Sequence, residues 1–189
     1  MIFKINNKPN VLIKGDILID TNIILWTFYS KMEKVVFYQR NIYPNFINSK
    51  LDTCKFYTTI YNLFEAFNII EKNEYDLYIN INKLDKITYK LKDFRNDPIN
   101  RQKVKEIINI TLKTIESAVT ILDYNFDNCD LNEFYNNFCN HKYDMFDYSL
   151  LKCAINKSIT CILTDDKDFC STSYLMDQIN IITANSNIN

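Results

Sequence analysis

Two short apolar runs in this chain each end directly in acid. Ile17–Ile19 is followed by Asp20, and Cys161–Leu163 is followed by Thr164–Asp166. A short unbroken apolar run bounded by polar residues is typical of a strand that is buried on both faces of a parallel sheet. Because ligands gather at the carboxyl ends of such strands, we expect these acids to collect along one edge of one sheet.

Two further acids, Glu65 and Asp147, lie on predicted helices between these strands. Asp147 shares a helical face with Leu150, Leu151 and Ala154, so its carboxylate is expected to point inward, toward the sheet. Burying an unpaired charge costs several kcal/mol, and like charges held close together repel one another. We therefore expect a cation or a network of hydrogen-bond donors among these acids.

Each acid also has an ordinary structural interpretation. An Asp after a strand often caps the next helix, an acid in a first helical turn complements the helix dipole, and a helical Glu is usually exposed. Adjacent acids after a strand are also common in polar loops. These interpretations apply in turn to Asp20, Asp147, Glu65 and the pair Asp165-Asp166.

Composition excludes several classes of site. A single glycine, Gly15, excludes both a P-loop and a Rossmann fingerprint. Six dispersed cysteines without a CxxC pair, and His141 as the one histidine, argue against a zinc finger and most histidine-based acid–base chemistry. The net charge of -1 gives no strong field toward nucleic acid, so a polyanionic partner must be held locally.

No targeting or membrane segment is expected. The first residues contain Lys4, Asn6, Asn7 and Lys8 too early for a signal peptide, and no segment approaches the ~20 apolar residues of a membrane span. We therefore expect a cytoplasmic protein whose thiols are free.

Strand-like and helix-like segments alternate along the chain. This alternation predicts an α/β protein of three layers, α/β/α, around a mainly parallel sheet, in one domain over residues 1–189 with a helical region at about 75–140. The expected strands lie within 3–13 (with a turn at 7–10) and at 17–20, 55–58, 159–164 and 179–183. The expected helices follow Thr59 and Asp144 and span 75–94 and 99–124, with a break at 96–98.

Nine basic residues lie on or beside the two helices predicted in the 75–124 region. They indicate either a solvated helix face or a surface that contacts phosphates. They are Lys83, Lys86, Lys90, Lys92, Arg95, Arg101, Lys103, Lys105 and Lys113.

The order of the acids resembles the PIN-domain family of metal-dependent ribonucleases. The resemblance covers Ile17–Asn22, Thr58–Phe67 and Asp144–Phe169, and its most specific part is the stretch Ile162–Phe169. It implies that the four acids of the family correspond to Asp20, Glu65, Asp147 and the strand-end Thr-x-Asp, here Thr164 and Asp166. Asp165 leaves the fourth assignment open by one residue. Asn22 and Asp144 are auxiliary candidates, with helix capping as the other role of Asp144.

The resemblance implies hydrolysis of RNA by water activated on Mg²⁺ or Mn²⁺, since a set of oxygen ligands suits these ions. The products would carry a 5′-phosphate and a 3′-hydroxyl. It also suggests the toxin of a toxin–antitoxin pair, with an antitoxin protein as partner and a homodimer as assembly.

Two alternatives to a nuclease remain. One is a catalytically silent PIN-like module that binds RNA or protein. The other is a haloacid-dehalogenase-like phosphatase, which is disfavoured because Asn22 stands where that family needs a second Asp, and its lysine has no clear candidate.

Overall fold

The computed structural model describes residues 1–6, 13–32, 35–123, 144–170 and 179–187, together with residues 132, 135, 136 and 139. In these residues one sheet of parallel strands has the order β1-β6-β5-β2-β3-β4. Its strands are β1 (Ile2–Lys4), β2 (Gly15–Ile19), β3 (Cys54–Thr59), β4 (Val119–Leu122), β5 (Cys161–Leu163) and β6 (Asn180–Thr183). The predicted turn at 7–10 and His141 lie outside the described residues.

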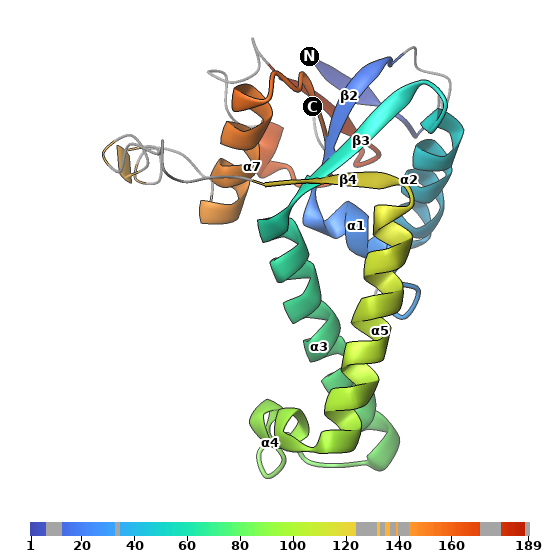
Figure 1. Ribbon diagram of the computed structural model, residues 1–189, viewed down its shortest axis with the longest axis vertical. Coiled ribbons are helices and arrows are strands. Elements are labelled where there is room, and N and C mark those ends of the chain that lie inside the picture. The colour runs from blue at the N-terminus through green and yellow to red at the C-terminus, as the bar shows by residue number, and fades with distance from the viewer. Residues whose placement is uncertain are drawn as a thin grey trace.

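Helices pack on both faces of the sheet (Figure 1). Ile17 and Ile19 of β2 belong to the core formed with α1, α2, α3 and α5, whereas Leu18 packs with α7 on the opposite face. The helices are α1 (Thr21–Phe28), α2 (Phe37–Lys50), α3 (Ile60–Asn82), α4 (Leu91–Asn96), α5 (Pro98–Glu116) and α7 (Met145–Asn156). The predicted α/β class with a parallel sheet between helices is therefore confirmed.

Several predicted helix ends are confirmed by their caps. The hydroxyl of Thr59 accepts a hydrogen bond from the Asn62 amide at the start of α3. The carboxylate of Asp97 caps α5, and Pro98 occupies the first turn of that helix, as the break at 96–98 predicts. Asp144 caps α7.

Other boundaries were predicted wrongly. The predicted helix over 99–124 ends at Glu116, and Val119–Leu122 forms the edge strand β4 beside β3. The residues of β4 fit a strand because three of its four side chains are β-branched. α3 continues to Asn82 and ends where Lys83 adopts a left-handed conformation (φ 53°), so the predicted helix over 75–94 is divided into the end of α3, a connection and α4. α2 was not predicted.

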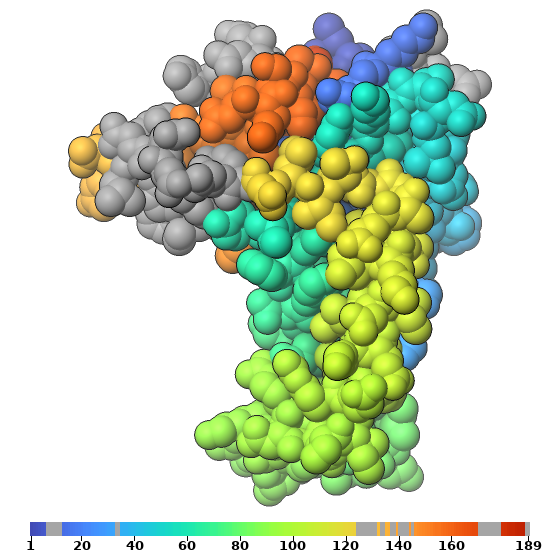
Figure 2. Space-filling model, viewed as in Figure 1, coloured from blue at the N-terminus to red at the C-terminus, as the bar shows by residue number. Residues whose placement is uncertain are grey.

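The far halves of α3 and α5, together with α4, form a projection that we call the helical arm (residues 71–105). It extends away from the sheet, with α4 at its far end (Figures 1 and 2). Apolar side chains from all three helices form a small core of its own. The members of that core are Tyr75, Ile79, Phe94 and Val104.

Ion pairs supplement the core of the helical arm. Glu71 on α3 accepts hydrogen bonds from Arg95 Nε (3.0 Å) and Arg101 Nη1 (2.7 Å). Glu74, one turn further on, pairs with Lys31 and Lys103 at 3.3 and 3.6 Å. Lys86 pairs with Asp76. Four of the nine basic residues noted in the sequence are thus used within the arm: Lys86, Arg95, Arg101 and Lys103.

Among the described helices, none combines the length and the apolar character that a bilayer span requires. Four cysteines in the same part of the chain are free thiols: Cys54, Cys139, Cys153 and Cys161.

Candidate functional site

Asp20 lies where β2 ends beside β5. Its backbone N–H donates to the carbonyl of Leu163 (3.1 Å), which extends the pairing of the two strands by one residue. The side chain is 6% exposed. Its Oδ1 accepts from the Thr21 amide at 2.6 Å, and its Oδ2 accepts from the Thr164 hydroxyl at 2.8 Å. Asp20 is therefore the N-cap of α1, as its structural interpretation predicts, and it also faces the end of β5.

Glu65 comes from α3, which follows β3 on the other side of β2. The hydroxyl of Thr21 donates to Glu65 Oε2 at 2.6 Å. The same hydroxyl accepts from Asn62 Nδ2 at 2.9 Å, and Asn62 is held by the Thr59 hydroxyl. These bonds connect the first turn of α1 to the first turn of α3 and fix the position of the Glu65 carboxylate.

Asp147 is the third residue of α7. Asp144 Oδ1 caps this helix by accepting from the amides of Phe146 (2.8 Å) and Asp147 (2.9 Å). The Asp147 side chain is half-buried. α7 therefore brings two acids to the site from its first turn.

The loop after β5 contributes Thr164 and Asp166. Besides donating to Asp20, the Thr164 hydroxyl accepts from the Asp166 amide at 3.0 Å. Asp166 Oδ1 in turn accepts from the Asp168 amide at 2.8 Å. The carboxylate of Asp165 instead binds side chains of α2.

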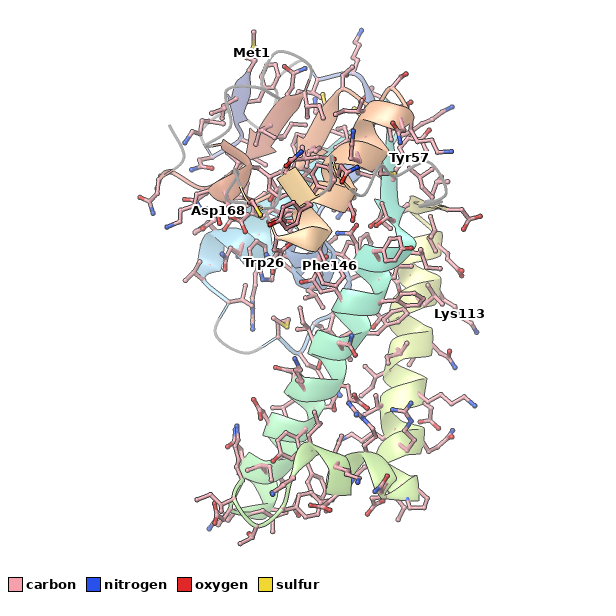
Figure 3. The ribbon with its side chains drawn as sticks, turned by 90° about the vertical axis from the view of Figure 1, so that its left-hand side faces the viewer. Met1, Trp26, Tyr57, Lys113, Phe146 and Asp168 are labelled. Carbon is pink, nitrogen blue, oxygen red and sulfur yellow. The ribbon has the colours of Figure 1, made fainter. Side chains whose placement is uncertain are left out.

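The acids surround a small pocket of about 70 Å³ at the carboxyl ends of the strands. Figure 3 labels Phe146 at the start of α7, where this helix meets the pocket. Of the candidates from the sequence, Asp165 and Thr164 do not line the pocket. Thr164 instead donates a hydrogen bond to Asp20, which does line it. The lining residues, which we call the acid pocket, are Asp20, Thr21, Asn22, Asn62, Glu65, Asp144, Phe146, Asp147 and Asp166.

Burial and mutual repulsion raise the pKa of two carboxyls in the acid pocket. The pKa of Asp147 rises to about 8, first through desolvation and then through the charges of Asp144, Asp20 and Asp166. Desolvation raises the pKa of Asp20 to about 7, against the lowering effect of hydrogen bonds from Thr164 and Thr21. In the described part of the chain, none of the ion pairs joins an acid of the pocket to a lysine or arginine.

The donor set of the acid pocket fits a hard, hydrated cation. Among the residues that the structure describes, its charged groups are carboxylates, with neither imidazole nor thiolate, and such oxygens suit Mg²⁺ or Mn²⁺ better than zinc. In the described residues, no three Asp, Glu, His or Cys side chains are arranged to hold one ion together. Mg²⁺ commonly keeps several waters and contacts only one or two carboxylates directly.

Sequence reasoning did not identify Thr21 and Asn62, which hold Glu65 in place. Their signal was weak, because Thr and Asn are ordinary residues in the first turn of a helix. It also missed the side chains of α2 that bind Asp165, since that helix was not predicted at all.

The established features of this protein are thus its α/β fold with a parallel six-stranded sheet in the described residues and an acid pocket at one edge of that sheet. Comparisons with protein-family models and with curated proteins found no match for this chain.

Proposed function

We propose that this protein is a PIN-like endoribonuclease that depends on Mg²⁺ or Mn²⁺. The observation that carries the proposal is the meeting of five acids from four separate segments in one pocket, without a lysine or arginine partner among the described ion pairs. Repulsion among such acids is relieved most directly by a cation. The resemblance of the acid-bearing segments to the PIN-domain family supports the same assignment.

Asp20, Glu65, Asp147 and Asp166 would hold the ion, directly or through water. A bound divalent ion lowers the pKa of a coordinated water and stabilises the charge that builds on a phosphate during displacement. Hydrogen bonds within the protein orient two of these carboxylates before an ion binds. Thr164 and the Thr21 amide orient Asp20, and the Thr21 hydroxyl orients Glu65. Such preorganisation reduces the rearrangement that ion binding would require.

The favoured substrate is a single-stranded or looped segment of RNA, because such a segment can bring a phosphate closer to recessed acids than a stiff duplex can. α1, α3 and α7 all begin at this pocket, and the positive ends of helix dipoles favour a phosphate there. The helical arm uses four of its basic residues in ion pairs within itself. A toxin role, with an antitoxin partner and a homodimer, rests on the family resemblance alone.

The test is cleavage of labelled RNA with Mn²⁺, with Mg²⁺ and with EDTA. We expect metal-dependent cleavage that Asp20→Asn abolishes, while the exposed Asp52→Asn on the turn before β3 cleaves like the parent protein. Thermal stability is measured beside it, because an ion that binds the native state raises Tm by mass action. A protein that neither cleaves RNA nor gains stability from Mn²⁺ would be the silent module instead.

A further inference from the structure

Asp165 is adjacent in sequence to Asp166, but its side chain points to the opposite side of the loop after β5. We propose that Asp165 is a positioning residue: α2 binds its carboxylate, and this contact directs Asp166 into the acid pocket. The expected effects on RNA cleavage rest on the proposed nuclease function, whereas the positioning of Asp166 can be tested without it. In this proposal, the hydrogen bonds from α2 determine which of the two adjacent acids faces the ion site.

Three neutral donors of α2 bind the Asp165 carboxylate. Tyr38 Oη and Gln39 Nε2 each donate to Oδ2 at 3.0 Å, and the Tyr43 hydroxyl donates to Oδ1. Asp165 is only 9% exposed, so these bonds replace most of its hydration. A carboxylate held in this way has few lone pairs left for a metal ion.

Tyr43 connects this contact to the end of β6. Its hydroxyl accepts from the Ala184 amide at 2.9 Å, and Asn185 Nδ2 donates to the Asp165 carbonyl at 2.9 Å. Tyr43 is fully buried. Burial and the neighbouring Asp165 raise the pKa of its hydroxyl above the ordinary value, so the hydroxyl remains a donor at neutral pH.

The geometry of the loop transmits the contact to Asp166. Successive side chains of a chain segment that continues from a strand point to opposite sides. Thr164 and Asp166 accordingly point toward Asp20 and the pocket, and Asp165 between them points toward α2. Fixing Asp165 on the α2 side therefore fixes Asp166 on the pocket side.

A comparison of two substitutions separates positioning from metal binding. Asp165→Asn keeps an oxygen that accepts from Tyr43, whereas Asp165→Ala removes every acceptor. We expect Asp165→Asn to keep kcat within about 3-fold of the parent and Asp165→Ala to lose about 10-fold or more, with KM for RNA little changed in both. Asp166→Asn should be as inactive as Asp166→Ala, because its charge is needed. If Asp165→Asn is as inactive as Asp165→Ala although its crystal structure keeps the Asp166 carboxylate in the pocket, the charge of Asp165 is required and the proposal is overturned. If Asp166 has turned out of the pocket in Asp165→Asn, the positioning role is supported.

A matched pair of tyrosine variants controls for lost stability. Tyr43→Phe removes a buried hydroxyl of the contact with Asp165, and Tyr75→Phe removes one that donates to the Tyr89 carbonyl (2.7 Å) in the helical arm. We expect both to lower Tm, but only Tyr43→Phe to lower kcat, by less than Asp165→Ala does, and to raise the Mn²⁺ concentration for half-maximal activity. An unchanged kcat and Mn²⁺ requirement in Tyr43→Phe would overturn the proposal.

Failure of the nuclease function is recognised separately. If the parent protein cleaves no RNA, the proposed function is wrong, and the position of Asp166 is read from crystal structures of metal-free Asp165→Ala and its parent. An Asp166 carboxylate turned out of the pocket in the variant supports the positioning role. An unmoved Asp166 contradicts it.

Discussion

The acid pocket and the helical arm both bury carboxylates, yet they surround them differently. In the arm, Glu71 pairs with Arg95 and Arg101, and the hydrogen bond from Arg95 lowers its pKa below the ordinary value. In the pocket, burial raises the pKa of Asp20 to about 7 and that of Asp147 to about 8. The fold thus stabilises the charged form of the carboxylate in the arm. In the pocket it provides little compensation for the same negative charge.

This difference distinguishes a structural acid from one that is available to a ligand. The arm acids join α3 to α4 and α5, so their partners belong to the fold itself. The pocket acids repel one another and would gain their compensation from outside. A buried charge without a partner is costly to the fold, and such sites are typical of function.

The largest expected effect is on cleavage by a pocket variant. Asp20→Asn should lower RNA cleavage by more than about 100-fold, because losing a ligand costs more than losing a group that only supports one. Metal-free Tm should stay equal or rise, since Asn can still cap α1 and carries no charge to desolvate. Activity assays and calorimetry of the same preparation measure both. Comparable cleavage by this variant would remove Asp20 from the mechanism.

The corresponding change in the arm should have the opposite outcome. Glu71→Gln removes the partner of two arginines, and we expect it to lose about 1–3 kcal/mol of unfolding free energy. Cleavage per folded molecule should stay within about 2-fold of the parent, because the arm contributes no residue to the acid pocket. Urea unfolding measures the first quantity and initial rates the second. A stable but inactive Glu71→Gln would show that the arm takes part in cleavage.

The pH dependence of stability should separate the two regions as well. Asp20 and Asp147 have raised pKa values, so their contribution to stability is complete below about pH 4 and is lost as pH rises toward 8. Glu71 has a lowered pKa, so its contribution is present at neutral pH and is lost as pH falls below about 4.5. Tm measured from pH 3 to 9 should therefore reveal both trends, and Asp20→Asn should reduce the loss at high pH. Added Mn²⁺ should oppose that loss increasingly as pH rises, since binding requires deprotonated ligands.

The smallest effect is expected for an exposed pair of the arm. Lys86 and Asp76 lie 2.7 Å apart with both side chains about half exposed, and such pairs contribute only ~0–1 kcal/mol. Lys86→Ala should therefore change Tm by about 2 °C or less and leave RNA affinity unchanged. A markedly weaker affinity, measured by fluorescence anisotropy with labelled RNA, would place a phosphate contact on the arm.

Local sequence signals predicted much of the framework. The apolar strands that end in acid, the capping residues Thr59 and Asp144 and the break at Pro98 all depend on residues a few positions apart. Such short-range rules fail where a segment suits two structures. The sequence from 117 to 122 continues the apolar spacing of α5, yet pairing with β3 makes Val119–Leu122 a strand.

By itself, the sequence predicted an α/β protein with acids following two of its strands, because strand patterning and helix capping depend on residues a few positions apart. Only the tertiary structure decided which acid of the Asp165-Asp166 pair enters the pocket. The donors that bind Asp165 lie on α2, more than 120 residues earlier in the chain. It also decided that Arg95 and Arg101 bind Glu71, since a hydrogen bond between distant residues forms only once packing has brought them together.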